Sequence, residues 1–163
     1  SRGTVGTAPG KVRSPMNQIT VRPMTPADID GVLAVEQASF AAPWSRRAFE
    51  AEMYDNDLAR YLVLEDGGRI VGYAGAWLIL DEAHVTNIAV HPTYRGRGLG
   101  KLLLNSLIQH MKAQGAASMT LEVKESNCVA QRLYTQLGFV VRGRREKYYT
   151  ETNEDAIIMW LDL

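Results

Sequence analysis

The sequence predicts a fold of the α/β (α+β) type, in which helices lie on the faces of a mixed β-sheet. Three apolar segments, 61–65, 70–80 and 83–90, follow one another without room for a crossover helix between them. Successive parallel strands require such a crossover, so this order argues against a doubly wound parallel sheet. Helix-periodic segments precede and follow the three strands, and no internal repeat is visible. The expected element order is β-α-α-β-β-β-α-β-α-β-β.

The first elements are a short strand and two helices. Residues 19–24 are expected to form the strand. The segment 25–28 (TPAD) then offers a capping threonine, a proline suited to the first helical position and an acidic residue for the positive helix end. Pro43 breaks this helix, and a second helix is expected over 45–54, capped by its serine. The Asp-Gly-Gly turn at 66–68 predicts a hairpin between the first two of the three central strands.

The second half alternates between the two periodicities. A helix is expected over about 98–114, and its inward residues are predicted at helical spacing to be Leu99, Leu102, Leu103, Leu107 and Met111. A strand over 118–123, a helix over 130–137, and two closing strands over 139–145 and 156–161 complete the pattern. Glycines follow both helices and favour their termination.

Composition limits the classes of partner. At 163 residues the chain has room for one domain with a well-formed core, and its formal net charge is zero. No overall field attracts nucleic acid or anionic lipid, so neither nucleic acid nor membrane is expected as a partner. The longest apolar segment, 70–80, is too short for a bilayer, and no signal sequence opens the chain. A lone cysteine, Cys128, excludes an intrachain disulfide and suits a reducing compartment, so a cytoplasmic protein is expected.

The N-terminal segment differs in character from the rest. Residues 1–15 contain scarcely any apolar side chain and are expected to form a flexible arm. Patterned sequence begins at Met16. We interpret the arm as a non-native remnant ahead of a single domain over 16–163, with a natural basic arm as the alternative. The three histidines are scattered and no Cys/His ligand spacing occurs, so no metal site is expected.

The most informative segment is 87–101, NIAVHPTYRGRGLGK. An apolar strand leads into a turn with three alternating glycines, and the turn opens a helix. Glycines let a ligand approach the main chain, and the N–H groups of a first helical turn lack helical partners. Together with the helix dipole they favour a phosphate or pyrophosphate. The turn is predicted to bind such a group; a glycine-rich turn without a ligand is the plainer alternative.

Spacing excludes two common nucleotide motifs. The dinucleotide fingerprint requires a glycine where Lys101 stands. A P-loop that ends at Gly100-Lys101 requires glycine at the position of Arg95 and serine or threonine at that of Leu102. The phosphate ligand is therefore expected to be of another kind.

The segment 95–100, RGRGLG, matches the R/Q-x-x-G-x-G/A motif of the GNAT acetyltransferase superfamily, in which it wraps the pyrophosphate of coenzyme A. The resemblance extends over about 19–163 and narrows to the RimI-type N-alpha-acetyltransferases. The further similar segments, in order, are FAAPWS 40–45, LDEA 80–83, LEV 121–123, SN 126–127, LY 133–134, LGF 137–139, YY 148–149 and EDAIIM 154–159. The resemblance implies the GNAT fold, with a mostly antiparallel sheet, and acetyl-CoA as cosubstrate.

Acetyl transfer to an amine requires a base for the amine, polarisation of the thioester carbonyl and a proton for the leaving thiolate. The resemblance assigns Glu122 as general base and Tyr134 as general acid. A solvated strand carboxylate and a ring packed in the core are the respective alternatives. Direct transfer in a ternary complex is expected, not a route through Cys128.

The resemblance also implies the coenzyme contacts. The main chain of 88–90 is expected to bind the pantetheine arm like an added strand, with one N–H polarising the carbonyl. Asn127 either contacts the coenzyme or caps the following helix. The full expected set is Ile88, Ala89, Val90, Arg95, Gly96, Arg97, Gly98, Leu99, Gly100, Lys101 and Asn127.

RimI-type enzymes acetylate the N-terminal alanine of a small-subunit ribosomal protein, and the same reaction is expected here. The walls of the amine pocket are expected at Trp44, Glu82, Tyr148 and Tyr149. A basic run at 142–147 is either a solvated strand face or a contact for acidic substrate groups. An acetyltransferase for lysine or a small amine, and a non-catalytic acetyl-CoA-binding partner subunit, are the alternatives. A monomer or weak oligomer is expected.

Overall fold

A computed structural model describes residues 18–163, and the arm predicted over 1–15 lies outside this range. A single sheet of seven strands forms the centre, in the order β1-β2-β3-β4-β5-β7-β6. The strands are β1 Ile19–Pro23, β2 Ala59–Asp66, β3 Arg69–Ile79, β4 Glu82–Val90, β5 Ser118–Lys124, β6 Val140–Tyr149 and β7 Glu154–Asp162. The helices are α1 Ile29–Ser39, α2 Arg46–Tyr54, α3 Leu99–Ala113 and α4 Cys128–Gln136, with short 3-10 turns at Pro26–Asp28 and Pro92–Tyr94.

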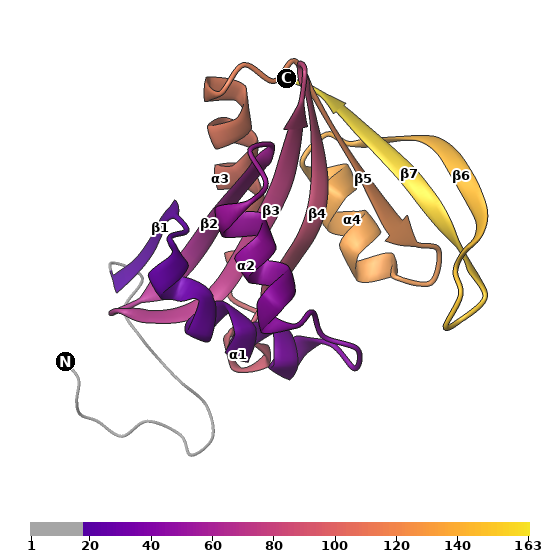
Figure 1. Ribbon diagram of the computed structural model, residues 1–163. Helices are drawn as coiled ribbons and strands as arrows, with labels where there is room; N and C mark the ends of the chain where they lie inside the picture. The colour runs from indigo at the N-terminus through magenta and orange to yellow at the C-terminus, as the bar shows by residue number, and fades with distance from the viewer. Residues whose placement is uncertain (1–17) are drawn as a thin grey trace.

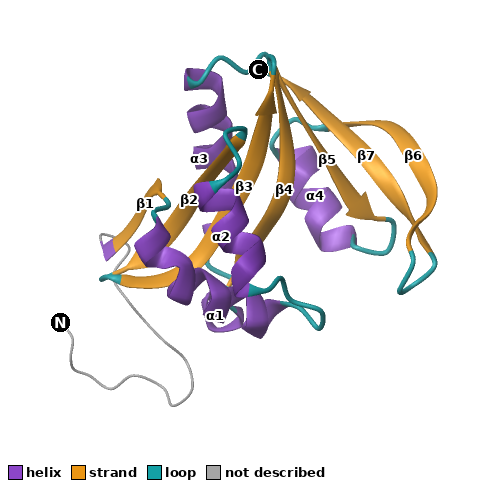
Figure 2. Ribbon diagram, viewed as in Figure 1, coloured by secondary structure: helices purple, strands orange, loops and turns teal. Residues whose placement is uncertain are grey.

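Helices cover both faces of the sheet (Figures 1 and 2). Helices α1 and α2 pack on one face over a core that includes Val32, Phe49 and Tyr73. Helices α3 and α4 pack on the other face over a larger core that includes Leu103 and Met119. Every strand pair is antiparallel except β4–β5, so the predicted mixed, mostly antiparallel sheet with helices on both faces is confirmed.

The predicted elements all form, with small shifts in their ends. The hydroxyl of Ser45 accepts from Ala48 N at 3.1 Å and caps α2 as expected. The prediction that Leu102 faces inward was wrong, since this residue is 38% exposed. Leu104 and Ile108 are buried instead. At about 100° per residue, Leu102 falls on the far side of α3 from the stripe through its buried residues. Leu102 therefore lies on the surface, although the spacing of the leucines predicted a buried position for it.

Among the strands of residues 18–163, β4–β5 is the only parallel pair and also the shortest ladder. Strand β4 pairs with β5 at Glu82↔Ser118, Ala83↔Met119 and His84↔Thr120, and at no later residue. Beyond this point the two strands diverge, which Figure 1 shows as a widening gap between them. The divergence coincides with a register shift between β3 and β4 that leaves Thr86 as an extra residue.

Gly75 is required at this bulge. A Cβ atom at Gly75 would lie 2.2 Å from Cε2 of Tyr61, so only glycine lets the Tyr61 ring cross β3 at this point. The ring then places its hydroxyl beside Thr86 and Asn87 on β4, at 3.2 and 3.1 Å. The side of the bulge that faces α1 and α2 is therefore fixed by packing and hydrogen bonds.

Candidate active site

The divergence of β4 and β5 opens a cavity of about 510 Å³ between them. Its walls come from the α1–α2 loop, the second half of β4, β5, α4 and the β6–β7 turn. The lining residues are Glu36, Phe40, Ala41, Ala42, Trp44, Val85, Thr86, Asn87, Ile88, Leu121, Glu122, Lys124, Tyr134, Tyr149, Glu151 and Thr152. Three carboxylates and one ammonium line it, so the cavity favours a cationic group.

The two residues predicted to exchange protons line the same cavity. Glu122 projects from β5, and Tyr134 projects from α4. Tyr134 is 8% exposed, and its ring packs 5.8 Å from that of Phe139. Burial raises the pKa of the Tyr134 phenol above its ordinary value of about 10, so the hydroxyl keeps its proton at neutral pH. The two residues that the resemblance assigned to proton transfer therefore border one cavity, and their catalytic roles stay a prediction.

The guanidinium of Arg145 forms an ion pair with Glu122. Nε of Arg145, on β6, lies 2.9 Å from Oε2 of Glu122, and the side chains are 59% and 30% exposed. The N–H is not aligned for a hydrogen bond, and Oε2 has no other partner among the described residues. The contact is therefore an ion pair at a buried oxygen, while the Glu122 side chain as a whole stays 30% exposed.

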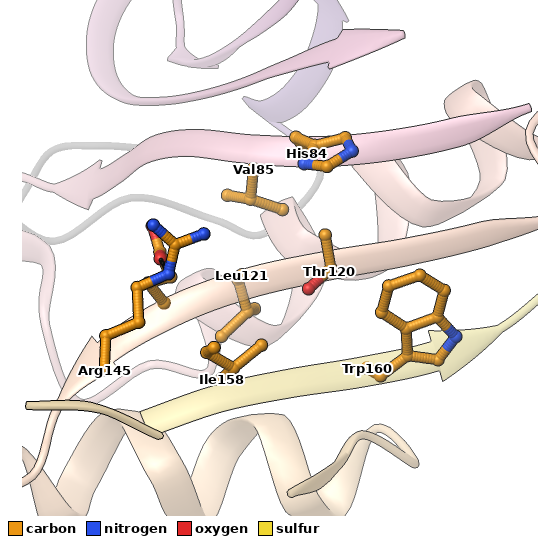
Figure 3. A pocket seen from close by; sticks show the side chains of 8 residues that line it. His84, Val85, Thr120, Leu121, Arg145, Ile158 and Trp160 are labelled. Atoms are coloured by element: carbon orange, nitrogen blue, oxygen red, sulfur yellow. Dashed lines mark ion pairs between the residues drawn. The ribbon is translucent and has the colours of Figure 1, made fainter. Parts of the chain in front are cut away.

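Arg145 belongs to a second cavity, of about 230 Å³, which shares Glu122 with the first. Figure 3 shows Arg145 reaching toward β5 beside Leu121, with His84 on β4 and Trp160 on β7 bounding the far end. Glu122 thus lies at the junction of the two cavities. The neighbouring Arg144 points elsewhere and pairs with Glu125 at 2.7 Å and Asp155 at 2.5 Å.

The edge of β4 beyond the bulge offers main-chain groups to the large cavity. His91 N donates to Val71 O at 2.8 Å, which makes this pair a hydrogen-bonded position of the β3–β4 ladder. Such positions alternate, so Ala89 also directs its amide to β3, whereas Ile88 and Val90 direct theirs toward β5. Of the three predicted main-chain positions, Ile88 and Val90 have amides that face the gap.

The glycine-rich loop follows this edge directly. Gly96 and Gly98 have φ values of +82° and +75°, which side chains rarely adopt, and nothing lies within 4 Å of a Cβ built at either. The first helical hydrogen bond of α3 runs from Leu102 N to Gly98 O at 3.1 Å. The N–H groups of residues 99–101 therefore have no helical acceptor and point out of the helix end.

Positive charge gathers around the loop. The guanidinium of Arg97 lies 4.7 Å from the ring centroid of Tyr94, and its buried Nη2 has no hydrogen-bond partner among the described residues. Burial, Arg69 and Arg95 lower the pKa of His91 below its usual value. Free amides, an unpaired guanidinium nitrogen and local positive charge together fit a diphosphate group.

Asn127 caps α4, which was one of its two expected roles. Its Oδ1 accepts from Ala130 N at 3.1 Å. Its Nδ2 is not used in this bond, so a contact with the coenzyme stays a prediction.

Two of the four predicted wall residues line the cavity. Trp44 and Tyr149 do so, but Glu82 and Tyr148 do not. Glu82 lies where β4 and β5 are still paired, and its carboxylate is 3.1 Å from Nε2 of His84. Tyr148 is 46% exposed, and its ring packs edge-on against that of Tyr149.

The most important wall residue missed by the sequence reasoning is Glu36. It projects from α1, is only 3% exposed and lines the cavity. The signal was present, since Glu36 lies seven residues after Ile29 and four after Val32, on the buried stripe of α1. A carboxylate at such a position requires hydrogen-bond partners.

Residues 18–163 contain neither a membrane-spanning helix nor a metal-binding cluster. No helix in this range is long and apolar enough to cross a membrane. No cluster of three or more histidine, cysteine, aspartate or glutamate residues in it could hold a metal ion.

Fold and cleft define the class of protein. The family model described as "Acetyltransferase (GNAT) family" matches residues 29–139, and the chain belongs to this family. It is a GNAT N-acetyltransferase.

The chain is 38% identical to the [ribosomal protein bS18]-alanine N-acetyltransferase of Escherichia coli K12 over 148 residues, covering 88% of this chain and 97% of the relative. A Bacillus subtilis relative that carries the same name provisionally is 43% identical over 143 residues, covering 88% and 95%. The crystal structure of the Escherichia coli ribosomal-protein-S18-alanine N-acetyltransferase superposes with a TM-score of 0.82 at 36% identity, covering 88% of this chain and 93% of that one.

Proposed function

We propose that this chain transfers an acetyl group from acetyl-CoA to the N-terminal alanine of ribosomal protein bS18. The relatives of that name support the substrate, since each aligns with nearly its whole length. One observation in the structure carries the chemistry. Glu122, Tyr134 and the free main-chain edge at Ile88 border one cavity, which suits a reaction that needs a base, an acid and a carbonyl-binding amide.

Acetyl-CoA supplies an activated acetyl group as a thioester. We assign its diphosphate to the loop at 95–101, where the N–H groups of 99–101 and the dipole of α3 face outward and the buried Nη2 of Arg97 has no hydrogen-bond partner among the described residues. We assign its pantetheine arm to the β4 edge, where Val90 and Ile88 direct their amides toward the gap. The arm would thus run from the loop toward Glu122 and Tyr134.

On the acceptor side, Glu122 receives the proton of the substrate amine. A protein α-amino group has a pKa of about 7.7–8, so near neutral pH much of it arrives as ammonium. The carboxylates that line the cavity attract this cation, and the Glu122 side chain, which is 30% exposed, accepts its proton. Arg145 holds the carboxylate from behind through its ion pair.

Two groups act on the thioester side. The Ile88 amide can donate to the acetyl carbonyl oxygen and stabilise the negative charge that develops there. Tyr134 donates its proton to the departing thiolate, and its raised pKa keeps that proton available. No residue of the chain becomes acylated, so Cys128 is not required.

The test is a peptide that begins with alanine and carries internal lysines, incubated with acetyl-CoA and the protein and read by mass spectrometry. One acetyl group on the α-amine is expected. A matched peptide with a blocked terminus should remain unmodified. Acetylation of lysines in the blocked peptide would instead support the lysine-acetyltransferase alternative, and no acetylation of either peptide would contradict catalysis by this chain.

A further inference from the structure

Two carboxylates are buried beneath α1 and α2, away from Glu122. Glu36 is 3% exposed and Glu52 is 7% exposed. No lysine or arginine forms a salt bridge with either one among the described residues. A buried carboxylate without a cation is tolerated only when hydrogen bonds replace its lost hydration. Both oxygens of each therefore require donors, and the structure supplies them.

Glu36 connects the α1–α2 loop to the sheet. Its Oε2 accepts from the main-chain N–H of Trp44 at 2.9 Å. Its Oε1 accepts from the hydroxyl of Tyr73, on β3. Burial, and next the hydrogen bond to Glu36, raise the pKa of Tyr73 far above its ordinary value, so this hydroxyl stays a donor.

Glu52 completes a continuous network but contacts no part of the loop. Its Oε1 accepts from Tyr61 Oη and Trp77 Nε1, both at 2.7 Å. Asn87 joins the two halves, because its Nδ2 donates to Tyr73 Oη and its Oδ1 lies within hydrogen-bond distance of Tyr61 Oη, each at 3.1 Å. Glu36 lines the large cavity, whereas Glu52 does not.

The loop that Glu36 holds has few other restraints. Residues 40–44 form no helix or strand, and four of the five line the cavity. Within the described chain, Trp44 is the only one of residues 41–44 whose main-chain N–H has an acceptor, and that acceptor is Glu36. The Trp44 ring also packs 5.3 Å from that of Phe49, which in turn packs 5.6 Å from that of Tyr73.

From these contacts we propose that Glu36 is a positioning residue for the acceptor peptide. It fixes the loop at 40–44 as one wall of the amine-side cavity, through the Trp44 amide, and touches no reacting atom. The inference rests on the proposed function for its kinetic consequence. Its structural premise, that the Glu36 carboxylate holds the Trp44 amide, can be tested independently.

The kinetic test compares Glu36→Gln with Glu52→Gln. Glutamine keeps the size but has one acceptor oxygen, so at residue 36 it leaves either the Trp44 amide or the Tyr73 hydroxyl facing an NH₂ group. Glu36→Gln should raise the peptide KM about ten-fold, with kcat and the acetyl-CoA KM nearly unchanged. Glu52→Gln disturbs an equally buried carboxylate of the same network, so it should lower the melting temperature and leave the peptide KM unchanged.

Equal peptide KM values for the wild type and a folded Glu36→Gln variant would overturn the proposal. So would an equal rise in both variants, because it would show a general effect of loosening the network. Should Glu36→Gln fail to fold, Glu36→Asp keeps the charge but shortens the reach, and the same comparison applies to it.

A second readout does not depend on turnover. Hydrogen exchange of the Trp44 amide, followed by NMR, should accelerate in Glu36→Gln and not in Glu52→Gln. Unchanged exchange in Glu36→Gln would overturn the positioning role even if the peptide is acetylated. Accelerated exchange with no acetylation by the wild type would support the contact and contradict the proposed function alone.

Discussion

The two walls of the cleft each carry a carboxylate, and the two carboxylates differ in burial and in hydrogen-bond partners. On the α1 side, Glu36 is buried, and both its oxygens accept hydrogen bonds from the Trp44 amide and the Tyr73 hydroxyl. On the β5 side, the Glu122 side chain is 30% exposed and pairs with Arg145, and its Oε2 accepts no hydrogen bond. A saturated carboxylate holds structure, whereas one with a free lone pair can take a proton. Residue type alone does not separate the two roles, but the count of partners does.

This comparison predicts its largest effect at the unsaturated carboxylate. Glu122→Gln removes the proton acceptor but keeps the size, so kcat for peptide acetylation should fall about 10²–10⁴-fold. Binding of coenzyme A, measured by calorimetry, should be unchanged because the loop at 95–101 is untouched. Wild-type turnover by Glu122→Gln would contradict the assignment of the base.

Tyr134→Phe should rank next, with a loss in kcat of about 10²-fold. The matched control is Tyr149→Phe, because Tyr149 also lines the cavity, and burial followed by the charge of Glu122 raises its pKa to about 12. Both phenols are thus protonated donors, and only Tyr134 is assigned as the acid. Rates measured for the two variants separate them, and a larger loss in Tyr149→Phe would reverse the assignment.

The pKa values of the substrate amine and of Tyr134 predict the pH dependence of the rate. Activity should rise with pH as the substrate α-amine loses its proton, with a midpoint near its pKa of about 7.7–8. Because the pKa of Tyr134 is raised, its acid form persists beyond its usual range, and no fall in rate from its ionisation should occur below about pH 10. A decline between pH 8 and 9 that disappears in Tyr134→Phe would show that this phenol ionises earlier.

A substitution in the glycine-rich loop should affect the binding of the coenzyme and not that of the peptide. Gly98→Ala places a side chain at a φ of +75°, so the loop should relax and the acetyl-CoA KM should rise about ten-fold with little change in the peptide KM. Gly115→Ala is the control, since its φ is +103° but it lies at the other end of α3. Equal KM changes in both would indicate general strain and not loss of the diphosphate site.

The smallest effect is expected at the cation behind the base. Arg145 is largely solvated, so its ion pair with Glu122 contributes little, and Arg145→Ala should lower kcat by about two- to five-fold. Arg144→Ala removes a neighbouring guanidinium whose partners are Glu125 and Asp155, and it should leave kcat unchanged. Steady-state rates at low salt test the difference, and a loss of more than about 10²-fold in Arg145→Ala would move this residue into the catalytic machinery.

Much of the fold could be predicted because it follows local patterns. Apolar periodicity gave the element order, and the three uninterrupted central strands gave a mixed sheet with helices on both faces. The divergence of β4 from β5 could not be predicted, since it depends on a bulge at Thr86 and on the Tyr61 ring crossing Gly75. These are contacts between distant segments, and no local pattern encodes them.

The candidate site divides in the same way. The turn chemistry of the loop and the positions of Glu122 and Tyr134 could be predicted from motifs. The ion pair of Arg145 could not, because neither of the two interpretations of the basic run at 142–147 placed it against Glu122. The burial of Glu36 could have been predicted, since this residue interrupts the apolar stripe of α1. An acidic residue at such a position indicates a buried hydrogen-bond network.

A crystal structure with a bisubstrate conjugate, in which coenzyme A is joined to the α-amine of an alanine-initiated peptide, tests the central claim most directly. We expect the diphosphate on the amides of 99–101, the linking carbonyl within hydrogen-bond distance of the Ile88 N–H, and Glu122 and Tyr134 on either side of the joined atoms. The peptide should leave between Trp44 and Tyr149. A conjugate whose joined atoms lie away from both Glu122 and Tyr134 would contradict it.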